Sequence, residues 1–303
     1  MRVNKWLKRS LMGAITIVVL GAAGLSLGAY LGDRKAQRQV QVTVSAVPVP
    51  SDAASLERGR YLFTSRGCSE CHGANGAGRE FINDGGSMVV KSPNISPGAG
   101  SVVARYSALD WVRTIRHGVK PNGQPVFIMP SEDYNRLTDA DVGALIAYAT
   151  QLAPASGDGL VAKLPALVKT LYAAGLIRDA AERIDHSLPP ATPVPVAVSA
   201  QHGAYIANMC IGCHNERLSG GKIPGGPPDW PPAANLTPGE GSAMPRYATA
   251  EQFTAMLRTG KRPDGSAVNK AMPFESLGAL NDTDAQALYL HLKALPPVTL
   301  GQR

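Results

Sequence analysis

The sequence predicts a mostly α-helical protein, in which an N-terminal transmembrane helix is followed by two small domains of the same design. Three observations support this prediction. An uncharged apolar run extends from Leu11 to Leu31, a set of short motifs occurs twice in the same order, and patterns typical of strands are hard to find. The chain has 303 residues, which is enough for two domains of ordinary size after a terminal segment.

The apolar run near the N-terminus is expected to cross a membrane. About 21 helical residues rise roughly 31 Å, which matches the hydrocarbon thickness of a bilayer. The side chains that precede the run are basic and orient it by the positive-inside rule: Arg2, Lys5, Lys8 and Arg9. We therefore expect residues 1–39 to anchor the protein in a bacterial inner membrane, with the N-terminus cytoplasmic and the remainder periplasmic. A signal peptide cleaved near Ser26 is the alternative.

The net charge of +7 does not point to an acidic partner. Residues 1–40 carry seven Lys or Arg and one Asp, so the remaining residues carry 30 − 7 = 23 basic and 23 − 1 = 22 acidic side chains. The exported part is therefore nearly neutral. No basic stripe interleaved with aromatic residues is present in the sequence, so nucleic-acid binding has no support.

A five-residue signature occurs twice, as Cys68-Ser69-Glu70-Cys71-His72 and as Cys210-Ile211-Gly212-Cys213-His214. Cys-x-x-Cys-His is the attachment site of a c-type haem. Two thiols one helical turn apart form thioether links to the two vinyl groups of the porphyrin, and the adjoining histidine reaches the iron. We therefore expect two covalently bound haem c groups, held by Cys68, Cys71, Cys210 and Cys213, with His72 and His214 as iron ligands.

Two simpler interpretations explain the cysteines less well. A zinc site would need both Cys-x-x-Cys pairs in one place, and such pairs are usually closer in sequence than these. A thioredoxin-like redox pair would leave the two adjoining histidines unexplained, and no βαβ pattern surrounds either pair.

The two halves of the chain repeat one another beyond the signatures. The repeated positions are Gly59 and Tyr61 with Gly203 and Tyr205; Asn94-Ile95-Ser96-Pro97-Gly98 with Asn235-Leu236-Thr237-Pro238-Gly239; and Arg116, Gly118, Pro121 and Gly123 with Arg258, Gly260, Pro263 and Gly265. We interpret this as a duplicated domain. The repeated arginines either pair with haem propionates or lie on a solvated helix face.

Helix signals define the expected domains. Thr138 with Asp141 and Asn281 with Asp284 have the spacing of a helix N-cap, and apolar residues recur at i, i+3, i+4 and i+7 after each. The segments 53–65 and 199–208, before the two signatures, are also expected to be helical. The predicted organisation is an anchor (1–39), a linker (40–52), a first domain (53–155), a connector that is helical over 160–184 and proline-rich over 188–198 (156–197), and a second domain (198–303).

Methionine is the expected second ligand of each iron. Met129 and Met272 follow His72 and His214 at nearly equal distances, and each precedes a proline and then the last helix. A thioether favours the ferrous state and raises the reduction potential. Met244 and Met88 have no methionine opposite them in the other half, and Met209 and Met256 are more simply core or flanking residues. No histidine outside the signatures recurs, which sets aside His117, His186 and His202. Ligation by two histidines stays open as the lesser alternative.

The chain resembles a membrane-anchored dihaem cytochrome made of two tandem class I cytochrome c domains, similar to cytochrome subunits of periplasmic dehydrogenases. The resemblance covers residues 53–155 and 198–298 and rests on the signature, the Asn-Ile/Leu-Ser/Thr-Pro loop, the Met-Pro loop and the capped last helix. It implies first and last helices that cross near Gly59 and Gly203. The chain has two signatures where such subunits often have three, and His291 stands where the first half has Tyr148.

These observations predict an electron carrier rather than an enzyme. It would pass single electrons from a dehydrogenase or other donor to an oxidase or another cytochrome in a respiratory chain. Two alternatives are a dihaem peroxidase, which needs one iron with an open position, and a subunit that serves as a fixed electron wire inside a dehydrogenase complex.

Overall fold

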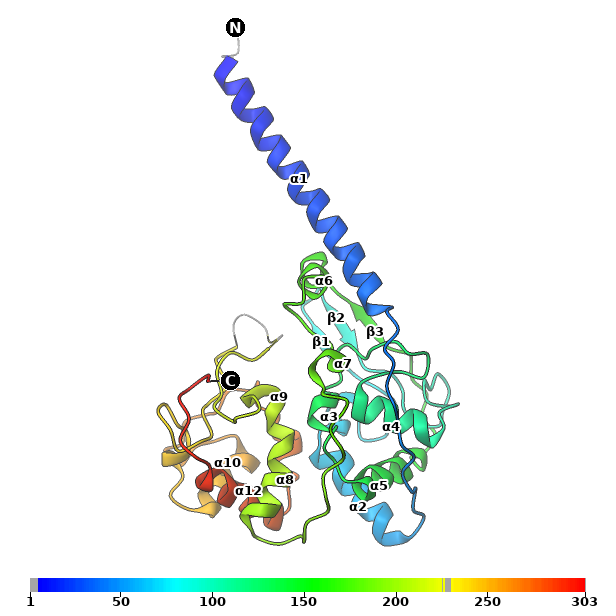
Figure 1. The fold of residues 1–303 in the computed structure, drawn as a ribbon, viewed down its shortest axis with the longest axis vertical. Helices are drawn as coiled ribbons and strands as arrows, with labels where there is room; N and C mark the ends of the chain where they lie inside the picture. The colour runs from blue at the N-terminus through cyan, green and yellow to red at the C-terminus, as the bar shows by residue number, and fades with distance from the viewer. Residues whose placement is uncertain (1–4, 225, 227–229, 303) are drawn as a thin grey trace.

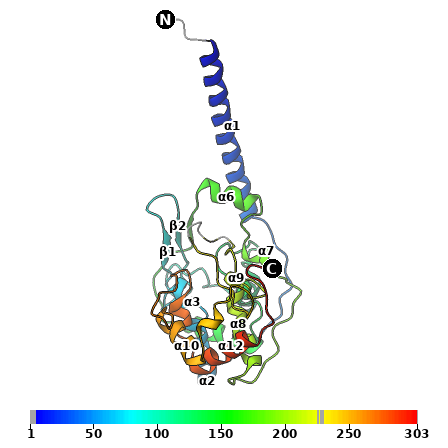
Figure 2. The same ribbon diagram turned by 90° about the vertical axis from the view of Figure 1, so that its left-hand side faces the viewer.

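The computed structural model describes residues 5–224, 226 and 230–302. One long helix projects from a body of two helical lobes (Figures 1 and 2). Each lobe surrounds its own cluster of buried apolar side chains. We call residues 53–155 lobe 1 and the described part of residues 199–302 lobe 2. Arg2, part of the predicted orientation signal, lies outside the described residues.

The projecting helix is α1 (Lys5–Ala36). Its segment Lys8–Ala36 is long and apolar enough to cross a membrane, and none of the tested window is buried in the protein. A cleaved signal sequence would pass the same test of length and composition. The helix extends beyond the predicted Leu11–Leu31 run at both ends, because the flanking charged residues are compatible with a helix in water.

The two lobes contain corresponding helices in the same order. In lobe 1 these are α2 (Ala53–Ser65), α3 (Cys68–His72), α4 (Ala108–His117), η1 (Ser131–Asp133) and α5 (Asp139–Thr150). In lobe 2 they are α8 (Ala200–Ala207), η2 (Asn208–Cys210), α9 (Ile211–His214), η3 (Met244–Arg246), α10 (Ala250–Thr259), α11 (Phe274–Leu277) and α12 (Asp282–Ala294). The helices predicted before each signature and at the end of each half are present.

Glycine allows the first and last helices of each lobe to cross at close range. A Cβ atom on Gly59 of α2 would lie 2.0 Å from the Ala144 carbonyl oxygen of α5. A Cβ atom on Gly203 of α8 would lie 1.9 Å from the Ala287 carbonyl oxygen of α12. Both distances are far below van der Waals contact, so the two backbones meet where only glycine fits. The crossing that the resemblance implied is confirmed.

The repeated loop motif makes the same hydrogen bonds in both lobes. The Asn94 amide donates to the carbonyl of Ala155 at 2.8 Å, and its side-chain oxygen accepts from the Ser96 backbone at 2.8 Å. The Asn235 amide donates to the carbonyl of Val298 at 2.7 Å and accepts from the Thr237 backbone at 2.9 Å. Each asparagine thus ties its loop to the chain that follows the last helix.

A small antiparallel sheet was not predicted. Its strands are β1 (Glu80–Asn83), β2 (Val89–Lys91) and β3 (Val161–Lys163), in the order β1-β2-β3, with Glu80 opposite Lys91 and Val89 opposite Lys163. Strands of three or four residues are too short to show an alternating pattern, and β3 comes from the connector.

The prediction of a helix over 160–184 is therefore wrong in part. The segment contains β3, α6 (Ala166–Ala173) and α7 (Ala180–Arg183), because Pro165 and Gly175 divide the apolar run. Residues 188–198 form no regular helix or strand, as expected for a proline-rich spacer.

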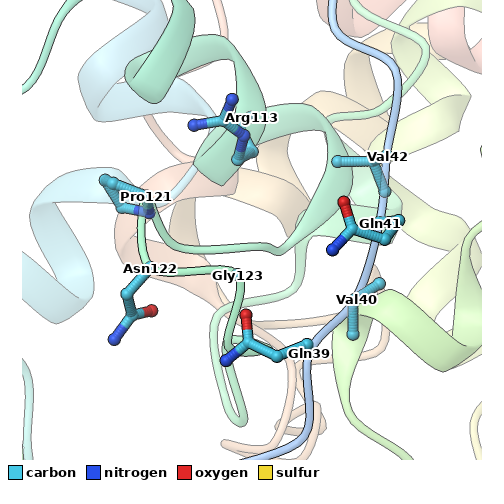
Figure 3. A pocket seen from close by; sticks show the side chains of 8 residues that line it. All are labelled: Gln39, Val40, Gln41, Val42, Arg113, Pro121, Asn122 and Gly123. Atoms are coloured by element: carbon cyan, nitrogen blue, oxygen red, sulfur yellow. The ribbon is translucent and has the colours of Figure 1, made fainter.

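The linker after α1 is extended and is in contact with lobe 1. It runs along lobe 1, where Val47 is buried and the backbone N–H of Val40 donates to the Gly123 carbonyl at 2.8 Å. Figure 3 shows the cavity of about 280 Å³ at this contact, lined by Gln39, Val40, Gln41, Val42, Arg113, Pro121, Asn122 and Gly123. The segment predicted as a linker is therefore packed on lobe 1.

Candidate haem sites

Both predicted signatures lie on short helical turns, each directly after the first helix of its lobe. Cys68–His72 form α3, and the second signature begins at the end of η2 and continues as α9. Such a turn places the two thiols of a Cys-x-x-Cys pair on one side, one turn apart. The four cysteines form no disulfide in the structure.

The histidines of the signatures are held in matching ways. Nδ1 of His72 lies 2.9 Å from the Pro93 carbonyl oxygen, and Nδ1 of His214 lies 2.8 Å from the Ala234 carbonyl oxygen. A carbonyl only accepts, so Nδ1 carries the proton in each ring and Nε2 keeps its lone pair. An outer partner of this kind orients the imidazole for a metal. Pro93 and Ala234 directly precede the repeated asparagines, so the loop motif supplies the acceptor.

Burial keeps the groups of both signatures uncharged. It lowers the pKa of His72 and of His214 below the ordinary value, so both rings are neutral, as a ligand of iron must be. It also raises the pKa of the thiols of Cys68 and Cys210 to about 12 and that of Cys213 to about 11. Conversion of these thiols to neutral thioethers by a bound haem would leave no charge in these apolar surroundings.

Each predicted methionine packs against the core of its own lobe. Met129 and Cys68 contact the cluster of lobe 1, and Met272 and Cys210 contact the cluster of lobe 2. Met129 directly precedes Pro130 and η1, and Met272 precedes Pro273 and α11. In each lobe, the signature and the methionine thus pack against the same apolar core. The residues present fit a covalently bound haem.

The competing candidate ligands have other contacts. Met244 and Met256 are 1% and 3% exposed within the core of lobe 2, as expected for packing residues. Nδ1 of His117 lies 3.0 Å from Nδ1 of His186, and Nε2 of His202 lies 2.8 Å from Asp284. Among the residues that the structure describes, no group of three or more His, Cys, Asp and Glu side chains is placed to hold a metal ion.

The repeated arginines bind the last helix of each lobe. Arg116 is buried, donates to the Leu137 carbonyl and pairs with Asp139 at 2.7 Å. Arg258 is exposed and pairs with Asp282 at 2.5 Å. These acidic partners occupy corresponding positions in α5 and α12. The start of the last helix therefore provides an acidic partner for each arginine.

The signature of each lobe touches the turn after the methionine of the other lobe. The Ser276 backbone N–H donates to Glu70 at 2.7 Å, and the Gly212 backbone N–H donates to Asp133 at 3.0 Å. Burial raises the pKa of Asp133 well above its ordinary value. A cavity of about 430 Å³ at this contact includes Cys71 of lobe 1 and Met272 of lobe 2 in its lining. Both signatures therefore lie at the interface between the lobes.

A second pair of contacts joins the lobes symmetrically. The Tyr205 hydroxyl donates to Asp141 at 2.5 Å, and the Tyr61 hydroxyl donates to Asp284 at 2.7 Å. Both aspartates were predicted only as cap residues. Thr138 and Asn281 do cap the helices, and each carboxylate also accepts a hydrogen bond from the tyrosine of the other lobe. The repetition of Tyr61 as Tyr205 was visible in the sequence, whereas their partners were not.

These aspartates also bind basic side chains. Arg58 makes two hydrogen bonds of 2.9 Å to Asp141. Arg66 and His202 lie 3.4 Å and 2.8 Å from Asp284, and all three side chains are buried. The pKa of Asp284 is lowered, because the hydrogen bonds from Tyr61 and His202 and the charge of Arg66 outweigh its burial. The interface thus contains a buried ionised network.

Two haem-attachment signatures on a mostly helical fold are typical of one class of protein. The chain is similar to c-type cytochromes. Residues 54–148 match the family described as cytochrome C oxidase, cbb3-type, subunit III. A covalent haem c follows from this similarity, and several relatives are named as cytochrome subunits of dehydrogenases.

The particular relatives are cytochrome subunits of dehydrogenases and a dihaem cytochrome. The fructose dehydrogenase cytochrome subunit of Gluconobacter japonicus is 28% identical over 82% of this chain and 54% of its own length. The gluconate 2-dehydrogenase cytochrome c subunit of Pantoea cypripedii is 25% identical over 84% and 63%. A dihaem c-type cytochrome of Cereibacter sphaeroides is 24% identical over 96% and 100%. The chain thus spans little more than half of the first relative.

Proposed function

We propose that the protein is a membrane-anchored dihaem cytochrome that passes single electrons from a dehydrogenase to a respiratory acceptor. It would consist of two tandem class I cytochrome c domains, 53–155 and 198–303, behind a spanning helix that leaves both in the periplasm. The occurrence of the same signature, carbonyl-bound histidine and methionine in both lobes carries this proposal. Each bound haem supplies a one-electron couple between ferric and ferrous iron.

The chain's own residues set the properties of each site. In lobe 1, Cys68 and Cys71 would hold the group covalently, with His72 and Met129 as iron ligands. In lobe 2, Cys210, Cys213, His214 and Met272 would have the same roles. The Pro93 and Ala234 carbonyls keep Nε2 of each histidine available, and the apolar clusters exclude water.

The interface between the lobes favours a fixed electron wire over two independent carriers. The Tyr61 and Tyr205 contacts and the buried Arg66–Asp284 pair hold one orientation of the lobes. Both signatures lie at this interface, and short separations favour electron exchange between two centres. The dehydrogenase relatives suggest a complex in which such a wire connects an oxidising subunit to the membrane.

Counting the haems tests the dihaem assignment. The mature wild-type chain should have the mass of the polypeptide plus two haem groups. Cys68→Ala with Cys71→Ala, and Cys210→Ala with Cys213→Ala, should each remove one group, whereas Ser69→Ala between two cysteines should keep both. A wild-type mass with one haem, or loss of both groups in either variant, would contradict two independent sites.

Isolation from native membranes tests the role in a complex. After mild solubilisation the chain should elute with a dehydrogenase, and that enzyme's substrate should reduce both haems. A chain that elutes alone and is reduced only by soluble donors would refute the wire and leave a free carrier.

A further inference from the structure

Helix α6 of the connector packs on the last turns of α1 (Figures 1 and 2). Gly28 and Gly32 are buried, whereas the described side chains of α1 before Gly28 are exposed. A Cβ atom on Gly28 would lie 2.5 Å from Thr170 Oγ1, and one on Gly32 would lie 2.3 Å from the Lys169 carbonyl oxygen. Small residues four apart allow such close contact between helices in membranes.

The polar groups at this contact are satisfied within the protein. Thr170 Oγ1 donates to the Ala166 carbonyl at 2.8 Å, and Lys35 Nζ donates to the Tyr172 carbonyl at 2.9 Å. Lys169 pairs with Asp33 at 2.9 Å. Few polar groups on α6 therefore require water, and the helix can approach an apolar phase at a low cost in free energy.

The outward side of the connector is apolar. Leu167 of α6 is 58% exposed and Leu176, just after the helix, is 73% exposed. Two further exposed apolar side chains precede α6: Leu160 and Val161. Helix α6 packs on α1, whose own exposed apolar side chains beside this contact include Leu27 and Leu31. We call Leu160, Val161, Leu167 and Leu176 the connector patch.

The position of α6 along α1 places the patch at a membrane surface. No charged side chain lies between Arg9 and Asp33, which are about 36 Å apart along a helix. A hydrocarbon layer of about 30 Å that begins beside Arg9 ends near Gly28, where α6 makes its contacts. Tyr30 and Arg34 are exposed there, and both are typical of the interface region.

We propose that the connector patch is seated in the outer surface of the phospholipid bilayer, beside α1, as a second membrane contact that does not span it. This rests on the proposed role of α1 as a spanning anchor. The bilayer is the occupant that the contacts favour, because the patch continues the surface of α1 that lipid would cover. Contact of both α1 and the connector patch with the bilayer would prevent rotation of the lobes about α1. The haem sites would then have a fixed orientation toward membrane-bound partners.

Photolabelling of the haem-loaded full chain in liposomes tests the proposal. The liposomes contain phospholipid with a diazirine on the acyl chain, and labelled peptides are identified by mass spectrometry. Residues 160–178 should be labelled about tenfold more than peptides containing the exposed leucines Leu109 and Leu290. Leu167→Glu with Leu176→Glu should lower that labelling about tenfold, and Leu109→Glu with Leu290→Glu should leave it unchanged.

The outcomes separate this proposal from the anchor on which it rests. Labelling of α1 without residues 160–178 would overturn the membrane contact of the connector and leave the anchor in place. Labelling of neither would overturn both. Unchanged labelling in the double Glu variant, or a cross-link of residues 160–178 to a second chain, would also overturn the proposal. An unchanged haem spectrum shows that these surface variants are folded.

Discussion

At the scale of single residues, the interface depends on charges that are buried together. Arg66 is 4% exposed and Asp284 is fully buried, and Tyr61 and His202 complete the hydrogen bonds of the carboxylate. Breaking such a pair from one side is costly, because the remaining charge stays buried without a partner. The network therefore contributes chiefly by fixing which surfaces of the two lobes meet.

Asp284→Asn should destabilise the protein by about 3–5 kcal/mol, since it leaves the Arg66 guanidinium without a counter-charge in a buried place. Denaturant unfolding of the haem-loaded chain measures this. Asp282→Asn is the matched control, because Asp282 is exposed and pairs with the exposed Arg258. Equal stability of the two variants would contradict the importance of the buried pair.

The stability of lobe 1 should depend on pH through the His117–His186 pair. Burial lowers the pKa of His117 to about 4, and the nearby charges of His186, Arg116 and Arg113 act in the same direction. The unfolded chain therefore binds more protons between about pH 6.5 and 4, so stability from this group is present above pH 6.5 and is lost as the pH falls toward 4.

Between pH 7 and 4.5 the free energy of unfolding should fall by about 1–2 kcal/mol more in the wild type than in His117→Gln, after allowance for solvent screening at a half-buried site. Parallel denaturant titrations of both proteins provide the measurement. Identical slopes would show that His117 is not held neutral by the fold.

At the scale of elements, caps and glycines were predictable and the short strands were not. Thr138 and Asn281 predict where the last helices begin, because each N-cap residue is followed by apolar residues at helical spacing. Strand β3 was not predicted, because three residues are too few to show an alternating pattern of apolar and polar side chains. Its partner, β2, also lies about 70 residues earlier in the chain. The cap pairs Thr138–Asp141 and Asn281–Asp284 are confirmed. The tyrosine of the other lobe that each carboxylate binds was not predicted, since a sequence shows a cap position but not a neighbouring lobe.

Gly59→Ala or Gly203→Ala should lower the free energy of unfolding by about 1–3 kcal/mol or more, because a methyl group at either position overlaps a carbonyl of the crossing helix. Thermal unfolding measures the effect. Gly86→Ala is the control, since a Cβ atom there meets nothing within 4 Å. A neutral Gly59→Ala variant would be incompatible with the observed crossing.

At the scale of the whole molecule, the proposed electron path through both lobes requires that the lobes stay together. Their contacts are reciprocal: each lobe offers a tyrosine to the last helix of the other, and each signature touches the turn after the other methionine. This arrangement could not be predicted from the repeat, because a duplicated sequence defines two similar lobes but not the surfaces through which they meet.

Tyr61→Phe with Tyr205→Phe removes two hydrogen bonds to carboxylates, each worth about 1.5–3 kcal/mol. Calorimetry should show one unfolding transition for the wild type and two for this double variant. Tyr289→Phe, which loses hydrogen bonds inside lobe 2, should keep one transition at a lower temperature. A single transition in the double variant would contradict the importance of the tyrosines and show that the remaining contacts, such as the Arg66–Asp284 pair, couple the lobes without them.

The proposed ligation of each iron by a histidine and a methionine is tested most directly by the ferric absorption spectrum. A weak far-red band is expected from methionine-ligated ferric haem in cytochromes of this type. Met129→Ala and Met272→Ala should each remove the contribution of one centre, and the double variant should have no band, while Met256→Leu in the core keeps it all. A band that persists in the double variant would contradict both assignments.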